Sequence, residues 1–179
     1  YIILFNEPNH ATEWGGEVDA KNYEEVAGEF AKKLHEKNKD FFIMLAGFDA
    51  SAPSYSNTYE DEEIFLREIS NFKFEIFNYI DGWSSHSYPN PGFSGTPWDT
   101  GRKSIRGYEW ELELLKELGL SKELPVFITE TGWVDYKLSR QTIASYYKQA
   151  FNNVWGPDEK VVAVTSFVFD YQAEPFLGF

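Results

Sequence analysis

The sequence contains no cysteine, which excludes disulfide bonds, thiolate nucleophiles and zinc sites built on cysteine but leaves the cellular compartment open. It is also short of basic residues, with 16 Lys and Arg against 29 Asp and Glu and a formal net charge of −13. Repulsion at this charge opposes binding to nucleic acid or to an anionic membrane surface. No apolar run approaches the roughly 18 residues that a membrane-spanning helix requires. We therefore expect neither nucleic acid nor a membrane as a partner.

What the sequence does contain is typical of one globular domain. The 179 residues suffice for a sizeable core, and the 42% hydrophobic and 18% aromatic content excludes a disordered chain. Apolar runs of strand length alternate with segments whose apolar residues recur at helical spacing. Strands are expected at 1–5, 41–47, 80–88, 124–130 and 161–169, and helices at 19–38, 59–79, 102–118 and 139–155. This alternation predicts an α/β fold with a parallel sheet.

The first two predicted helices are amphipathic, and their apolar residues are expected to face a sheet. These residues are Tyr23, Val26, Ala27, Phe30, Ala31 and Leu34 in the first helix, and Ile64, Phe65, Ile69, Phe72, Ile76 and Phe77 in the second. The acids that open the second helix, residues 60–63, suit the positive end of its dipole and are read as a solvated first turn.

Two architectures fit five strand-helix units. A five-stranded doubly wound sheet would be complete at this length, whereas a (β/α)8 TIM barrel would lack about three units. Asn6-Glu7-Pro8 stands where a doubly wound nucleotide-binding fold would place its glycines, and the sequence begins within a strand-like run. We therefore expect residues 1–179 to be the C-terminal part of a single TIM-barrel catalytic domain whose N-terminal strands are absent. The strands at 1–5 and 161–169 should then expose unpaired edges.

Two glutamates stand at strand ends. Glu130 closes the apolar run 124–129, and Glu7 follows the run 1–5, where Pro8 is expected to hold Glu7 in an extended conformation. The carboxyl ends of parallel strands are where such folds bind their ligands. Two acids placed there, in an aromatic-rich chain, match the needs of glycoside hydrolysis, in which one carboxyl protonates the leaving oxygen and the other attacks or activates water.

These motifs resemble those of clan A, the retaining (β/α)8-barrel glycoside hydrolases that include cellulases, mannanases and xylosidases. The resemblance rests on Asn6-Glu7-Pro8, on Thr129-Glu130-Thr131-Gly132-Trp133, and on His86-Ser87-Tyr88 in the strand between them. Period-two alternation already places His86 and Tyr88 on one face of that strand. The chain would correspond to strands four to eight of such a barrel.

The resemblance implies a role for each motif. Glu7 would be the acid/base and Glu130 the nucleophile of a double displacement that cleaves β-glycosidic bonds of a poly- or oligosaccharide. Asn6 would bind the sugar 2-hydroxyl, Tyr88 would donate a hydrogen bond to Glu130, and His86 would flank the sugar. Phe169 or Phe167 stands at the position where many clan members carry a tryptophan that forms the floor of the subsite.

Further candidates have two interpretations each. His10 either lines the sugar site or makes a local hydrogen bond. Trp14, Trp98 and Trp133 are loop aromatics that either stack on sugar rings or pack the rim of the site. The carboxylates of Asp49 and Asp170 either bind sugar hydroxyls or serve the structure. Trp83, Trp110 and Trp155 are assigned to the core. No metal or other cofactor is expected, because His10 and Glu13 lack the further ligands of a metal site.

Two other functions remain open at the level of the sequence. One is a carbohydrate-binding or otherwise non-catalytic relative of such barrels, because the absent strands would carry part of the sugar site. The other is a nucleotide-binding doubly wound domain, in which the first and last strands are sheet edges rather than neighbours of missing strands.

Overall fold

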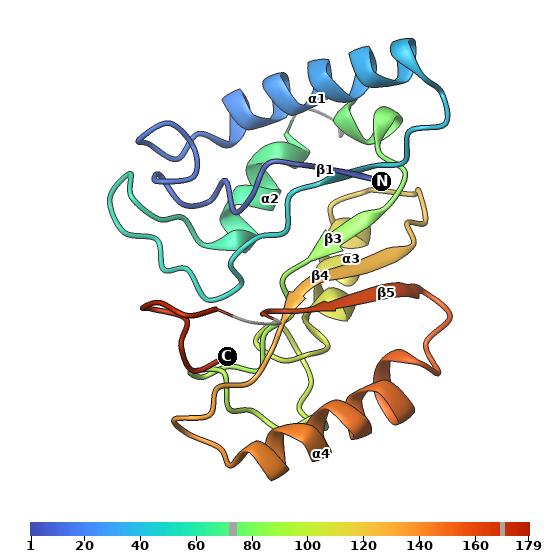
Figure 1. Cartoon of the computed structure of the whole chain (residues 1–179). Helices are drawn as coiled ribbons and strands as arrows, with labels where there is room; N and C mark the ends of the chain where they lie inside the picture. Colours follow the sequence, from blue (N-terminus) through green and yellow to red (C-terminus); the bar gives the residue numbers. More distant parts are fainter. Residues whose placement is uncertain (72–74, 169–170) are drawn as a thin grey trace. The chain divides into compact units, whose positions relative to one another are not determined.

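The structure is a computed structural model that describes residues 1–71, 75–168 and 171–179 (Figure 1). Internal contacts divide the chain into two compact units. The first unit comprises Tyr1–Ser84 with Leu112–Pro125, and the second comprises Ser85–Glu111 with Val126–Phe179. In the described part of the chain, no helix combines the length and the apolar character needed to cross a membrane.

Strands and helices alternate, as the sequence predicts. The first unit contains β1 (Ile2–Leu4), α1 (Ala20–Lys37), β2 (Ile43–Leu45), α2 (Glu62–Ser70) and the 3-10 helix η1 (Glu75–Tyr79). The second contains β4 (Val126–Thr131), α4 (Arg140–Ala150), the π-helical turn η2 (Phe151–Trp155) and β5 (Val161–Ser166). Strand β3 (Trp83–Ser85) and helix α3 (Gly107–Glu117) each contribute residues to both units.

The strands form parallel sheets in sequential order. β1 pairs with β2 in register from Ile2↔Ile43 to Leu4↔Leu45, and the second sheet has the order β3-β4-β5, with β4 and β5 parallel. Within the first unit, Met44 of β2 also bridges in parallel to Gly82, just before β3. A doubly wound sheet reverses its strand order partway along. The described strands show no such reversal, and the α/β class with parallel sheets is confirmed.

Helix α1 has the bounds that its sequence predicts. The side chain of Asp19 accepts a hydrogen bond from the backbone N–H of Asn22 at 2.8 Å, which satisfies a donor that the first helical turn leaves free. Behind it, the buried hydroxyl of Tyr23 donates to the Leu4 carbonyl at 3.3 Å and accepts from the Ala46 N–H at 2.9 Å. This side chain therefore fastens α1 to the ends of both β1 and β2.

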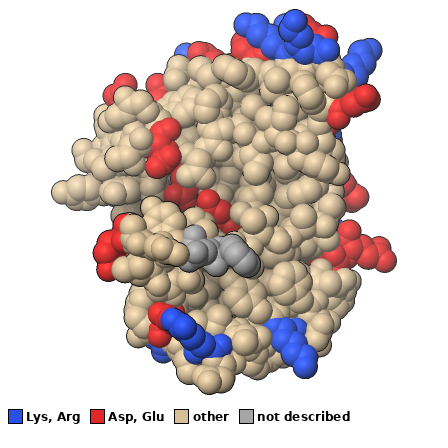
Figure 2. Space-filling model, viewed as in Figure 1, with Lys and Arg blue, Asp and Glu red and all other residues tan. Residues whose placement is uncertain are grey.

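The outer face of α1 corrects one expectation. Ala27 and Ala31 face the core, whereas Phe30 is 54% exposed. Val26, Phe30 and Leu34 instead line an open groove of about 570 Å³ that is edged by charged side chains: Glu25, Glu29, Lys33 and Lys37. Figure 2 shows basic side chains gathered over this helix. Small residues suit the close approach of helix and sheet. Of the larger side chains in this stripe, Tyr23 is buried, Val26 and Leu34 are partly buried, and Phe30 is exposed.

The second predicted helix is also shorter than expected. It is replaced by α2 and η1, and Phe72 lies outside the described residues. Ile64 is 44% exposed rather than inward, while Phe65 and Ile69 are fully buried. The side chain of Asp61 caps α2 by accepting from the Glu63 N–H at 3.0 Å, which explains why the helix begins at residue 62 rather than 59.

Two of the three tryptophans assigned to the core are fully buried, one in each unit. Trp155 is buried and donates its indole N–H to the Ile105 carbonyl at 3.1 Å, as its assignment to the core predicts. In the first unit Trp83 is likewise fully buried. Trp110 is only half-buried, with the guanidinium of Arg102 lying 4.8 Å from its ring centroid. Exposed apolar side chains occur on the first and last strands, with Ile3 43% and Val162 55% exposed.

Candidate active site

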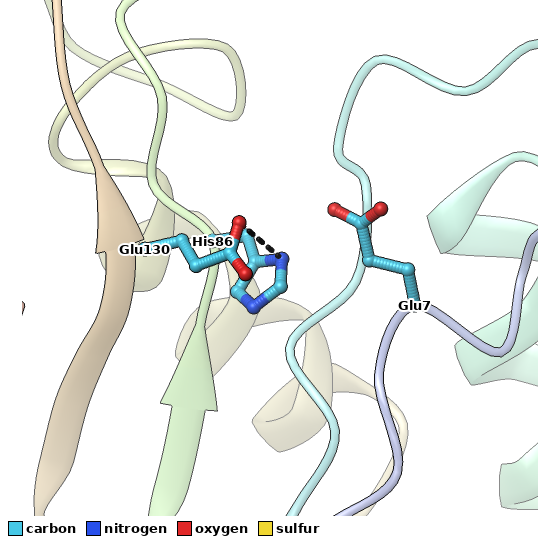
Figure 3. A group of neighbouring side chains, drawn as sticks. All are labelled: Glu7, His86 and Glu130. Carbon is cyan, nitrogen blue, oxygen red and sulfur yellow. Dashed lines mark ion pairs between the residues drawn. The ribbon is translucent and has the colours of Figure 1, made fainter. Parts of the chain in front are cut away.

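Glu130 is the penultimate residue of β4, and two residues that follow β3 contact it. The hydroxyl of Tyr88 donates to its Oε2 at 2.9 Å, as expected, and Nδ1 of His86 lies 3.7 Å from the same oxygen. Figure 3 shows the ring of His86 beside the carboxylate of Glu130. The side chain of His86 is 3% exposed and that of Glu130 is 26% exposed. Glu130 is therefore anchored by a donor from within the protein while part of it remains open to a ligand.

The threonines on either side of Glu130 bind β4 to the end of β3 and to the residues that follow it. Thr131 donates its hydroxyl to the Ser87 carbonyl at 2.7 Å, and Thr129 reaches the Ser85 carbonyl at 3.5 Å. The Ser87 hydroxyl accepts from the backbone N–H of Tyr108 at 3.0 Å, which adds the start of α3 to the same network. Alternation along the strand turns the threonines to one face and Glu130 to the other. The position of the carboxylate is thus set by hydrogen bonds behind it.

Gly132 is required by a close backbone approach. A Cβ atom at this position would collide with the carbonyl oxygen of Phe167 and would lie 3.2 Å from the Phe179 ring. The Thr-Glu-Thr-Gly sequence therefore places next to Glu130 and Thr131 the one residue type that lets the chain leave β4 beside the segment after β5.

Aromatic side chains surround Tyr88. The rings of Phe93, Phe167 and Phe179 lie edge-on to it, at centroid distances of 5.1, 6.4 and 6.1 Å. Phe93 holds a left-handed backbone conformation with φ 57°, and its carbonyl accepts from the Val134 N–H at 3.3 Å. These rings restrict the orientation of Tyr88 and give the neighbourhood of Glu130 an apolar wall.

Glu7 lies at a strained exit from β1. Its backbone has φ 36° and that of Phe5 has φ 74°, so Glu7 is left-handed rather than extended as Pro8 led us to expect. Such a conformation costs on the order of 1 kcal/mol for a residue with a side chain. The Glu7 N–H donates to the Gly47 carbonyl at 3.1 Å, and its carbonyl accepts from the His10 N–H at 2.8 Å. The resulting turn brings the side chain of His10 back beside that of Glu7, which is 20% exposed.

Asn9 holds this turn to the end of β2. It is fully buried, and its amide donates to the carbonyls of Asp49 at 3.0 Å and Glu60 at 3.1 Å. Its side-chain oxygen accepts from the Asp49 N–H at 3.2 Å. Burial of an amide is favourable only when its groups are paired, so these bonds tie together three segments at the carboxyl ends of β1 and β2.

His10 forms a hydrogen bond within the first unit, but its partner lies 39 positions away, so this is not the local bond that was one of its two interpretations. Its Nε2 lies 3.0 Å from Oδ2 of Asp49, and its ring packs edge-on against Tyr59 with centroids 4.9 Å apart. The hydrogen bond to Asp49 raises the pKa of His10 above its ordinary value of 6.5. The charges of Glu7, Asp49 and Glu13 act in the same direction, while burial opposes them.

The other predicted site residues differ in their exposure to solvent. Asn6 is exposed, and Trp14 is half-buried with its ring edge-on to Phe5 and Tyr23. Trp133 is only 2% exposed and donates its indole N–H to the Gly95 carbonyl at 2.7 Å. Its ring also packs against Tyr147 at 4.9 Å, so Trp133 packs the rim and is not a surface on which a sugar ring can stack. Phe169 and Asp170 lie outside the described residues.

Comparison with known proteins shows a likeness in fold. No family model matches the chain, and no curated protein does. A solved structure that does match is that of a family 39 glycoside hydrolase from the gut symbiont Bacteroides cellulosilyticus WH2, with 20% sequence identity and a TM-score of 0.55. The match covers 83% of this chain and 29% of that chain. At this identity the likeness shows a shared fold, and our chain spans less than a third of the length of its structural neighbour.

Asn9, Phe93 and Phe179 were not predicted from the sequence to contribute to this site. Asn9 offered one signal, a polar residue in the turn directly after an acid and a proline. Phe93 lies in the long loop after β3, where its neighbours Pro91 and Gly92 predicted only a turn. Phe179 carried no signal, because its partners lie far away in the sequence.

Proposed function

We propose that this protein is a retaining glycoside hydrolase that cleaves β-glycosidic bonds, with Glu130 as its nucleophile. The observation that carries the proposal is the arrangement around Glu130: a carboxylate at the end of a parallel strand, with Tyr88 donating to it at 2.9 Å and buried His86 beside it. Donors of this kind stabilise the ionised carboxylate, which is the form that attacks. The fold shared with a family 39 glycoside hydrolase supports the same reaction class.

Glu7 is proposed as the acid/base. In the first step the Glu130 carboxylate attacks the anomeric carbon, and Glu7 gives its proton to the departing glycosidic oxygen, so that an ester to Glu130 forms as the glycosidic bond breaks. In the second step Glu7 removes a proton from water, the water oxygen attacks the same carbon, and the Glu130 carboxylate is released. Both residues end the cycle as they began. The strained backbone at Glu7 supports this role, because such conformations cluster at functional sites.

We further propose that residues 1–179 are the C-terminal part of a TIM-barrel catalytic domain. The sequential parallel strands support this, as does the match to a fraction of a longer glycoside hydrolase. Apolar groups on the outer face of α1 and along β1 are suited to covering by another strand-helix unit. Asn6 and the exposed loop tryptophan Trp98 remain candidates for sugar contacts.

A fluorinated sugar tests the nucleophile. The complete polypeptide that carries residues 1–179 is incubated with activated 2-deoxy-2-fluoro-β-glycosides of several common sugars, and its intact mass is measured. We expect a gain of one fluoroglycosyl group, located by peptide mapping to residues 124–133, and no gain in Glu130→Gln. Binding of oligosaccharide without any adduct or turnover would instead indicate a non-catalytic carbohydrate-binding protein and would overturn the proposal.

Substitutions at the other two residues separate their roles. Glu7→Ala should slow hydrolysis of substrates with poor leaving groups by roughly 10²–10⁴-fold, with azide restoring turnover of activated ones. Tyr88→Phe should lower kcat/KM about 10- to 100-fold, because the Glu130 carboxylate loses a hydrogen-bond donor. Tyr136→Phe, at a side chain that is 66% exposed, is the matched control and should match wild type.

A further inference from the structure

The ring of His10 lies between two carboxylates of the first unit. Its Nε2 is 3.0 Å from Oδ2 of Asp49, and its Nδ1 is 3.8 Å from Oε2 of Glu7. The side chains of His10, Glu7 and Asp49 are 18%, 20% and 32% exposed. Glu13 adds a third negative charge near the ring, and Tyr59 presents its ring edge. The imidazole is therefore partly withdrawn from water and surrounded by groups that favour its cation.

Asp49 is itself fixed in place. Its Oδ1 accepts from the backbone N–H of Ser51 at 2.7 Å, and its own N–H and carbonyl bind the buried amide of Asn9. An ionised carboxylate only accepts hydrogen bonds, so the Nε2 of His10 that faces it carries a proton. The other nitrogen, Nδ1, is then the atom that is protonated and deprotonated when His10 titrates. That atom is the one that faces Glu7.

We propose that His10, clamped by Asp49, is a positioning residue that sets the protonation state of Glu7. This rests on the proposed function, in which Glu7 holds a proton in the first step and none in the second. When Glu7 is ionised, the His10 cation stabilises it. When Glu7 carries its proton, that attraction is absent, and the second proton of His10 is held less tightly. The charge of Glu7 therefore acts on His10 across this contact, and Asp49 fixes the ring orientation that brings the two groups together.

The coupling is testable by the titration of His10 itself. The chain has three histidines, so NMR titration of wild type and His10→Gln assigns the resonances of His10. We expect a wild-type midpoint above 6.5, which falls in Asp49→Asn because the hydrogen-bonded charge is lost. It should also fall in Glu7→Gln. An unchanged midpoint in Glu7→Gln would overturn the coupling, whether or not the protein is a glycosidase.

The pH–rate profile tests its role in catalysis. In His10→Gln the alkaline limb of kcat/KM, where the acid/base loses its proton, should move upwards by roughly half to one pH unit. This is the size expected for a unit charge about 4 Å away in a water-like dielectric. The matched control is His35→Gln, because His35 also pairs with an acid, Asp81, at 3.3 Å within the first unit. Its profile should match wild type.

The outcomes keep the two proposals apart. If the fluoroglycosyl adduct on Glu130 fails to form while the midpoint of His10 still changes in Glu7→Gln, the proposed glycosidase function is wrong. The coupling between His10 and Glu7 then stands, but His10 has no role in glycoside hydrolysis. If the adduct forms but the alkaline limb of His10→Gln coincides with wild type, the function stands and the positioning role of His10 is wrong.

Discussion

At the scale of single residues, Glu60 carries a carboxyl group that the fold makes hard to ionise. Burial raises the pKa of Glu60 to about 7, and the charges of Glu68 and Asp61 act in the same direction. A carboxyl whose pKa is higher in the folded than in the unfolded state holds its proton more tightly when folded. Its contribution to stability is fully present below its ordinary pKa of 4.5 and is lost as pH rises through about 7.

Glu60→Gln should therefore change stability in a pH-dependent way. The neutral amide avoids the cost of a buried charge, so the free energy of unfolding at about pH 8 should exceed that of wild type by on the order of 1 kcal/mol, after allowance for solvent screening. The gain should shrink towards about pH 5, where the wild-type carboxyl is protonated. Urea titrations at both pH values measure the difference, and Glu123→Gln, at an exposed acid, is the control. A gain of equal size at both pH values would contradict the account.

Some contacts of single residues were predictable from the sequence. The prediction that His86 and Tyr88 point together is confirmed, because both contact Glu130. The strand expected over 80–88 ends at Ser85, however, so both residues follow β3 and strand alternation does not account for their positions. The hydrogen bonds of Asn9 to Asp49 join residues 40 positions apart, and no pattern of spacing encodes them. The backbone conformation of Glu7 was also not predictable from the sequence. The clash with Pro8 disfavours the right-handed helical region for Glu7, but it does not distinguish an extended residue from a left-handed one.

At the scale of secondary-structure elements, the ends of α1 were easier to predict than the face it buries. Helix α1 begins after Asp19 and ends before Asn38. Helix α3 ends at Glu117, close to the expected residue 118 and just before Gly119 with φ 105°, but it begins at Gly107 rather than at 102. Capping depends on neighbours in the chain. Helical spacing placed Phe30 in one stripe with Ala27, but it does not specify how much of the stripe the protein covers, and Phe30 lies outside.

The cap of α1 gives a prediction at this scale. Asp19→Ala removes the acceptor of the 2.8 Å hydrogen bond from the Asn22 N–H, and we expect a loss of about 1 kcal/mol in the free energy of unfolding. Asp19→Ser retains an acceptor and should lose much less. Urea titrations monitored by circular dichroism compare the two. Equal losses in both variants would show that the cap does not limit the stability of α1.

At the scale of the whole molecule, the apolar surface left open determines how the chain behaves alone. Ile3 of β1 is 43% exposed, Phe30 of α1 is 54% exposed and Val162 of β5 is 55% exposed. In the described residues β1 pairs with β2 and β5 with β4, each on one side. A strand edge that combines unpaired backbone groups with apolar side chains is a template for association.

Residues 1–179 in isolation should therefore associate with rising concentration, which sedimentation velocity measures directly. Ile3→Lys with Phe30→Lys places charges on the strand and helix that a further strand-helix unit would cover, and should shift the distribution towards monomer. Trp98→Lys tests apolar exposure alone, because this side chain is 57% exposed and belongs to the loop between β3 and α3 rather than to a strand. It should leave association unchanged. If the wild-type chain is monomeric at every concentration and unfolds sharply and reversibly, its edges are already satisfied and the partial-barrel proposal is wrong. If only the complete polypeptide is monomeric, the same surfaces are those that the remaining strand-helix units cover.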